Sequence, residues 1–234
     1  MTGIFDALDA TWPAAATHPA GSWLVRDGRG GGKRVSAATA TEDGAAAHID
    51  AAEAAHKALG QPPIFCLRGG QDVLDQALAA RSYRTADPVV IYAAPAGRLT
   101  GEPPARLSTF PIWPPLAIMK EVWAEGGIGP ARLAVMDRVI GPKVSILGRA
   151  GDRAAGAGFV AMHDNTAVIH ALHVLPDQRH KGLARNIMRA AALWASDQGA
   201  DQIALAVTKA NDAANALYTA LGMTIIDQYH YRVK

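Results

Sequence analysis

Cysteine is nearly absent from this sequence of 234 residues. The sequence also has no long apolar run. The single Cys66 cannot form a disulfide within the chain, and its apolar neighbours from Ile64 to Leu67 indicate a buried strand residue rather than a nucleophile. No apolar stretch approaches the length that crosses a membrane, and the acidic start does not fit a secretory signal. The sequence therefore predicts a cytoplasmic protein.

An excess of one charge is missing as well. The 23 basic and 21 acidic residues give a net charge of +2 and are spread along the chain. Such a balance creates no strong field for a polyanion, so nucleic acid is not an expected partner, and neither is a membrane. Half of the residues are hydrophobic and only 6% are aromatic, which is typical of an ordinary globular protein.

One stretch, from Ala167 to Trp194, organises the rest of the chain. Its first part, Ala167 to Leu175, is apolar and β-branched and predicts a buried strand. A turn with Gly182 follows, and then a helix whose apolar stripe predicts one buried face. The residues of that stripe are Leu183, Ile187, Ala191 and Trp194.

The turn before this helix predicts an anion site. The first N–H groups of a helix have no intrahelical partner and lie at the positive end of its dipole. Arg179, His180 and Lys181 add charge, and Gly182 lets the backbone approach a ligand closely. We expect the amides from about His180 to Arg185 to hold a phosphate or pyrophosphate. A basic helix start that faces solvent is the alternative for this short pattern alone.

Two ordered patterns resemble the signatures of the GNAT superfamily, the acyl-CoA-dependent N-acyltransferases. The first is Arg179-x-x-Gly182-x-Ala184, which is similar to Arg/Gln-x-x-Gly-x-Gly/Ala. The second, Asn211 to Met223, is similar to Asn-x-x-Ala-x-x-Leu-Tyr-x-x-x-Gly-Phe/Met and follows at the family's distance. The resemblance covers roughly Pro115 to the C-terminus.

This resemblance implies a function. It implies an enzyme that uses acetyl-CoA or CoA as cosubstrate, needs no metal, and transfers the acyl group to a primary amine by direct attack in a ternary complex. The acceptor is a small molecule or a peptide, bounded by the loop Glu125 to Pro130 and the final hairpin near Gln228 to Tyr231. A non-catalytic acyl-CoA-binding or sensing module of the same fold is the alternative.

The resemblance also implies catalytic roles. Tyr218 matches the tyrosine that protonates the leaving thiolate, and a packed helix tyrosine is the alternative. His170 is similarly placed to a histidine of arylalkylamine-type acetyltransferases and is the candidate base, with a hydrogen-bonded core histidine as the alternative. Because a regular strand alternates faces, His170 and His173 are expected on opposite sides of the sheet.

The cosubstrate-binding residues implied by the resemblance fall in three places. The strand edge pairs with the pantetheine amides, the turn holds the pyrophosphate, and the second signature lines the pantetheine arm. Asn211 can equally be a helix N-cap. The residues are Leu172, His173, Val174, Arg179, His180, Lys181, Gly182, Leu183, Ala184, Arg185, Asn211 and Ala214.

The first half of the chain matches the second when Phe65 is set on Leu205 without gaps. This predicts an α/β (α+β) fold of two GNAT-like units, each a mixed, mostly antiparallel central sheet flanked by helices. The expected division is a degenerate GNAT-like domain 1–100, a proline-rich linker 101–115 and a catalytic domain 116–234. At this offset Glu42 faces Gly182, so the first half should bind no cosubstrate, and the chain should act as a pseudo-dimeric monomer or a homodimer. Chance similarity of alanine-rich sequences is the alternative.

Periodicity also predicts the individual elements. Strands are expected at 23–26, 33–40, 64–67, 83–93, 143–149, 156–163, 166–175 and 202–208. Helices are expected at 44–59, 71–80, 116–124, 131–138, after Gly182 and after Asn211.

Overall fold

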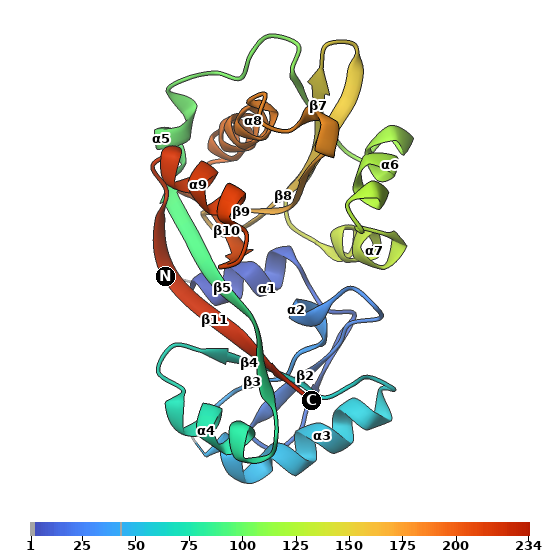
Figure 1. Ribbon diagram of the computed structural model, residues 1–234, viewed down its shortest axis with the longest axis vertical. Helices are drawn as coiled ribbons and strands as arrows, with labels where there is room; N and C mark the ends of the chain where they lie inside the picture. The colour runs from blue at the N-terminus through green and yellow to red at the C-terminus, as the bar shows by residue number, and fades with distance from the viewer. Residues whose placement is uncertain (1–2, 43) are drawn as a thin grey trace. The chain divides into compact units, whose positions relative to one another are not determined.

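The structure is a computed structural model that describes residues 3–42 and 44–234, and these form two compact units (Figure 1). Unit 1 comprises the chain up to Pro13 with Ile91–Ala206 and Ala213–Ile225. Unit 2 comprises Ala14–Val90, Val207–Asp212 and Ile226–Lys234. The fold is mixed α/β, with mostly antiparallel strand pairing and flanking helices, as the sequence predicts.

Unit 1 is built on the strands β6-β7-β8-β9-β10, in that order. Neighbouring strands from β6 to β9 are antiparallel, whereas β9 and β10 are parallel. The strands β5 (Arg84–Pro95) and β11 (Thr224–Val233) are divided between the two units. The other elements are α1 (Ile4–Thr11), α5 (Ala96–Thr100), β6 (Thr109–Ile112), α6 (Ala117–Glu125), α7 (Pro130–Arg138), β7 (Lys143–Ala150), β8 (Arg153–His163), β9 (Thr166–Val174), η2 (Pro176–Gln178), α8 (Leu183–Asp197), β10 (Gln202–Thr208) and α9 (Asp212–Ala220).

Helix α8 packs against strands β7 and β8, where small residues face it. A Cβ atom added to Gly148, Gly156 or Gly158 would come within 2.8 to 3.0 Å of the Ile187 side chain. The Ile187 side chain is fully buried in the space that these glycines leave. Helix α6 packs on the opposite face of the sheet, as Figure 1 shows. This packing fixes the start of α8 beside the end of β9.

Unit 2 has its own apolar core. The Phe65 ring lies edge-on to Trp23 and Tyr83, with centroid distances of 4.8 and 5.1 Å. A three-stranded antiparallel sheet has the order β1-β2-β3, and β4 pairs antiparallel with the end of β11. The elements are β1 (Ala16–Pro19), β2 (Trp23–Asp27), α2 (Lys33–Ser36), β3 (Thr39–Ala40), η1 (Ala45–His48), α3 (Ile49–Ala58), β4 (Ile64–Arg68) and α4 (Asp72–Ala80).

Most predicted elements are confirmed, but two are wrong. Residues 33–40 do not form a strand, because Lys33–Ser36 forms the single helical turn α2 and only Thr39–Ala40 pairs with β2. Eight residues span only about two helical turns, so their periodicity cannot separate a helix from a strand. Helix α1 and the strands β1 and β6 were not predicted. The expected hairpin near Gln228 to Tyr231 is not present, because these residues lie inside the unbroken strand β11.

The boundaries of the two compact units differ from those of the predicted domains. Helix α1 belongs to unit 1 because it packs on β8 and β9, and Ile226–Lys234 belongs to unit 2, where its residues pair with β4. Within the predicted linker 101–115, Thr109–Ile112 forms β6 and pairs with β7. The interpretation of the two halves as a duplicated unit stays a prediction.

A partly buried ion pair ties the end of β11 to α4 in unit 2. The Arg232 guanidinium donates to both carboxylate oxygens of Asp75, and His230 Nε2 lies 2.7 Å from Asp75 Oδ1. The Arg232 hydrogen bonds come first among the causes that lower the pKa of Asp75 to about 2. Because the folded pKa is below the unfolded value of about 3.9, this stabilisation is complete above pH 4 and is lost as the pH falls through 2.

We expect Asp75→Asn to destabilise unit 2 by about 2 kcal/mol at pH 7, because it leaves a largely buried guanidinium without its carboxylate. Urea unfolding of both proteins between pH 2 and pH 7 measures this. The difference should shrink toward zero near pH 2. A difference that stays constant over this range would contradict the assignment.

Among the described residues, no helix combines the length and the apolar character needed to cross a membrane.

Candidate functional site

A short loop joins the end of β9 to the start of α8. It consists of the 3-10 turn η2, an extended Arg179, and two positions in the left-handed region, His180 with φ of 60° and Gly182 with φ of 80°. Such an alternation of conformations is a backbone arrangement typical of anion sites. Gly182 is the N-cap residue of α8.

The amides of this loop are available to a ligand. The first intrahelical bond of α8 runs from Asn186 N–H to Gly182 C=O at 3.1 Å, so the amides of residues 183–185 have no helical acceptor. In the described part of the chain, residues 180–182 also donate to no backbone carbonyl. A Cβ atom at Gly182 would meet nothing within 4 Å, so the space in front of it is open. This donor set fits a phosphate group.

The side chains of the loop are arranged around this backbone. Arg179 Nε donates to Val174 O at 3.1 Å and so brings the loop and the strand end together. Lys181 Nζ donates to Asp177 O at 3.0 Å. His180 and Arg185 are exposed, Ala184 is half-buried, and the Leu183 side chain is in the core. The predicted residues from 179 to 185 therefore form one site in which backbone N–H groups are the main donors.

Strand β9 has an irregular edge just before this loop. Its ladder with β10 pairs Ile169 with Leu205, and among the described residues it extends no further.

On its other side, β9 has a bulge. Strand β8 pairs with His170 and His173, and the register shifts between them. Two residues of β9, Ala171 and Leu172, therefore face one residue of β8, which is a β-bulge. Ala171 has a φ of 52°, and its carbonyl accepts a bond from Trp123 Nε1 at 2.8 Å.

The bulge changes the directions of the two histidines. His170 pairs with Phe159 and His173 with Ala157, and residues two apart on β8 share a face. His170 and His173 thus point to the same face of the sheet, the one opposite α8. The prediction that they point to opposite faces is wrong because it assumed an unbroken strand.

His170 is held in a buried aromatic site. It is 5% exposed, and its ring stacks on Trp12 at a centroid distance of 5.0 Å. His170 Nε2 lies 2.9 Å from Thr11 Oγ1, and the Thr11 hydroxyl donates its proton to Ala7 O at 2.6 Å. Thr11 must therefore accept from an Nε2–H group. This setting supports the alternative of a hydrogen-bonded core histidine, and the role of His170 as base stays a prediction.

Tyr218 is on α9 and is 6% exposed. Its ring centroid is 5.6 Å from that of Tyr92, and burial raises the pKa of Tyr218 to about 12. The phenol is therefore neutral at pH 7 and can act as a donor. Asn211 directly precedes α9, where its N–H donates to Thr208 O, and Ala214 is half-buried on α9.

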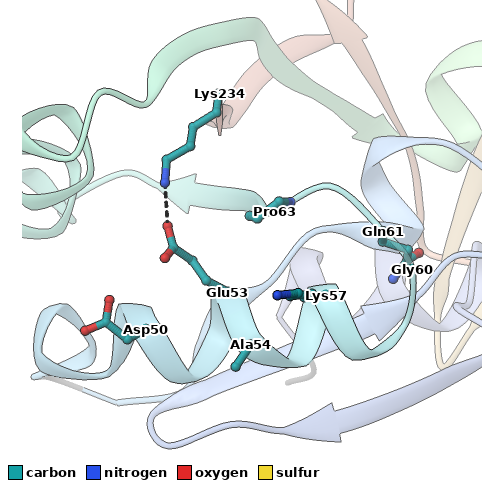
Figure 2. Close-up of a pocket in the computed structure, with 8 residues that line it drawn as sticks. All are labelled: Asp50, Glu53, Ala54, Lys57, Gly60, Gln61, Pro63 and Lys234. Carbon is teal, nitrogen blue, oxygen red and sulfur yellow. Dashed lines mark hydrogen bonds and ion pairs between the residues drawn. The ribbon is translucent and has the colours of Figure 1, made fainter.

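Unit 2 contains a hollow of about 520 Å³ that the sequence did not indicate. Figure 2 shows Glu53 in it bonded to Lys234, with Asp50 and Lys57 along the same helix. Asp50 also pairs with Arg81. The hollow contains none of the predicted site residues. Across residues 3–42 and 44–234 no group of three or more His, Cys, Asp or Glu side chains is placed to hold a metal ion.

Sequence reasoning missed the residues that surround the histidines. Thr11 and Trp12 come from α1 and its C-cap. They belong to no motif of the sequence, and no local signal could have identified them.

Comparisons with known proteins agree with this geometry. Residues 133–223 match the model of the Acetyltransferase (GNAT) family. The chain is 26% identical over 234 residues to the uncharacterized N-acetyltransferase YobR of Bacillus subtilis strain 168, covering 96% of this chain and 95% of that protein.

Two solved structures show the same fold. A GCN5-related N-acetyltransferase from Kribbella flavida aligns with a TM-score of 0.70 at 18% identity, over 97% of this chain and 92% of that one. A tandem GNAT protein from the clavulanic acid biosynthesis pathway aligns with a TM-score of 0.63 at 14% identity, over 95% and 84%.

Proposed function

We propose that this chain, as a member of the GNAT acetyltransferase family, is an acetyl-CoA-dependent N-acetyltransferase acting on a primary amine. The observation that supports this best is the run of backbone N–H groups from His180 to Arg185, which opens onto free space at Gly182. These donors would hold the pyrophosphate of CoA, and Arg179 would add charge beside them. When bound, acetyl-CoA supplies the acetyl thioester.

The edge of β9 gives this ligand a second place to bind. Beyond Ile169 the ladder with β10 has ended, so the backbone of Leu172 to Val174 can pair with the amides of an extended chain. The bond from Arg179 to Val174 joins this edge to the phosphate site. A ligand with a pyrophosphate at one end and amides along its arm matches both.

Tyr218 is the proposed acid of the reaction. Because its pKa is raised to about 12, its hydroxyl keeps its proton at pH 7 and can donate it to a developing thiolate. The amine attacks the thioester directly within a ternary complex, so no covalent intermediate on the protein is needed. Asn211 and Ala214 would line the arm of the cosubstrate.

The test is thermal stabilisation by CoA and acetyl-CoA, followed by an amine panel assayed for free thiol. Stabilisation with amine-dependent thiol release supports the enzyme. Stabilisation without release from any amine would favour the acyl-CoA-binding module. No stabilisation at millimolar CoA would overturn the phosphate site itself.

We also propose that the chain consists of two GNAT-like units of which only the C-terminal one binds CoA. The likeness to a tandem GNAT protein supports this, and so does Glu42, which the sequence offset places opposite Gly182. A carboxylate at that point would repel a phosphate. Small-molecule or peptide amines are the proposed acceptors, and the chain would act as a pseudo-dimeric monomer or a homodimer.

We expect isothermal titration of the full chain with CoA to give one site per chain. The loop from His180 to Arg185 combines charge, glycine and amides that have no backbone acceptor. A stoichiometry of two, with both sites lost to different substitutions in the two halves, would contradict the degenerate first half.

A further inference from the structure

His173 lies between the cosubstrate edge of β9 and the loop that follows α6. Its side chain is half-buried, and it points away from α8. A Cβ atom added to Gly126 would come within 2.5 Å of His173 Nδ1, so the imidazole packs directly on the glycine backbone. Gly126 belongs to the loop Glu125 to Pro130, which the resemblance to GNAT enzymes implies as a boundary of the acceptor site. His173 therefore joins the proposed cosubstrate edge of β9 to this loop.

The two histidines on this face of the sheet differ in their hydrogen-bond partners. His170 bonds Thr11 and stacks on Trp12, so its ring is fixed on several sides. His173 Nε2 is buried and has no hydrogen-bond partner among the described residues. A buried polar atom without a partner needs an explanation, because most such atoms in folded proteins are paired. A polar group of a bound substrate would supply that partner.

We propose that His173 is the catalytic base that takes the proton of the acceptor amine at Nε2. This inference rests on the proposed function. The N–H bond of the ammonium breaks, its electron pair stays on nitrogen, and the proton forms a new N–H bond at Nε2. The free amine then attacks the thioester, and the imidazolium later returns its proton to solvent.

The charges around His173 suit this role. Burial is the first cause that lowers the pKa of His173 below its ordinary value near 6.5, and the Arg179 cation lowers it further. The Glu125 carboxylate acts in the opposite direction. The ring is therefore neutral at pH 7 and ready to accept a proton. Glu125 can then stabilise the imidazolium that forms.

His170 has a different part in this arrangement. Its Nε2–H is committed to Thr11, and aromatic rings cover it. We assign it as a positioning residue that fixes the strand just before the bulge. The bulge in turn directs His173 to the face of the sheet opposite α8.

The experiment measures kcat/KM against pH for the full-length enzyme and for His173→Gln, with one amine that the panel identifies. For His173→Gln we expect kcat/KM to fall by about 10²-fold at pH 7. The acid limb of its pH profile should move up to the pKa of the amine itself, so that activity recovers in alkaline buffer. Thermal stabilisation by CoA should be unchanged. His163→Gln, at the end of β8, is the control and should keep the parent profile.

Gly126→Ala provides a second variant, which keeps the imidazole of His173 but shifts its position. Its new methyl group cannot fit beside the ring, so its profile should shift in the same direction as that of His173→Gln. His170→Gln should lower activity without moving the acid limb.

A His173→Gln profile that parallels the parent at every pH would overturn this inference, even with CoA binding and amine acetylation intact. So would a shifted limb in His170→Gln alone. An absence of CoA stabilisation in the parent protein would instead mean that the proposed function fails.

Discussion

Tyr218→Phe is expected to lower turnover with a given amine by roughly 10²- to 10⁴-fold, which is the usual contribution of a positioned acid. The substitution removes one hydroxyl and keeps the ring that packs near Tyr92. Because the side chain is 6% exposed and its phenol is neutral, the change alters a proton donor and little else. Steady-state kinetics at saturating acetyl-CoA measure the effect.

The matched control for this variant is Tyr92→Phe. Tyr92 is 5% exposed, lies on β5 and loses the same hydroxyl, but nothing places it in the reaction. We expect its turnover to stay within about threefold of the parent. CoA stabilisation should be the same in both variants. Equal turnover of Tyr218→Phe and the parent would remove Tyr218 from the chemistry, and a lost CoA response would assign it to binding instead.

Gly182→Asp should abolish the stabilisation that CoA gives. At a hundredfold excess over its dissociation constant, a ligand that binds only the native state adds about 2.7 kcal/mol, which corresponds to a rise of about 5–10 °C in Tm for a chain of this size. A carboxylate at Gly182 would enter the open space in front of the loop amides and repel the pyrophosphate. Differential scanning fluorimetry with and without CoA measures the loss.

Two controls separate charge from backbone strain. Gly199 follows the other end of α8, has a φ of 83° against 80° at Gly182, and also faces open space. Gly199→Asp should therefore cost similar stability but keep the CoA response. Gly182→Asn keeps the strain without the charge and should retain part of the response. If Gly182→Asp responds to CoA as the parent does, the pyrophosphate binds elsewhere.

The phosphate site could be predicted because everything it needs is close in sequence. The apolar stripe of α8 is confirmed at Leu183, Ile187 and Ala191, which are all buried, and Gly182 takes the left-handed conformation that a glycine turn allows. A strand end, a glycine turn and a helix start encode such a site locally, since each depends on neighbours within a few residues.

The face of the sheet that carries the histidines was decided by tertiary structure. The direction of His173 depends on the bulge, and the bulge exists because β9 has one residue more than β8 between two paired positions. Periodicity along one strand cannot show this, because it records neither the partner strand nor its register. The sequence alone therefore placed the two histidines on opposite faces.

The sequence by itself determined the strand, the glycine turn and the helix that present the loop amides, and it identified Tyr218 through a motif. Only tertiary structure decided that α1 brings Thr11 to His170, 159 positions away, and that the end of β11 pairs with β4 in unit 2. Local propensity acts over a few residues, whereas these contacts form only when the chain closes long loops and buries apolar faces that many alternative partners could cover.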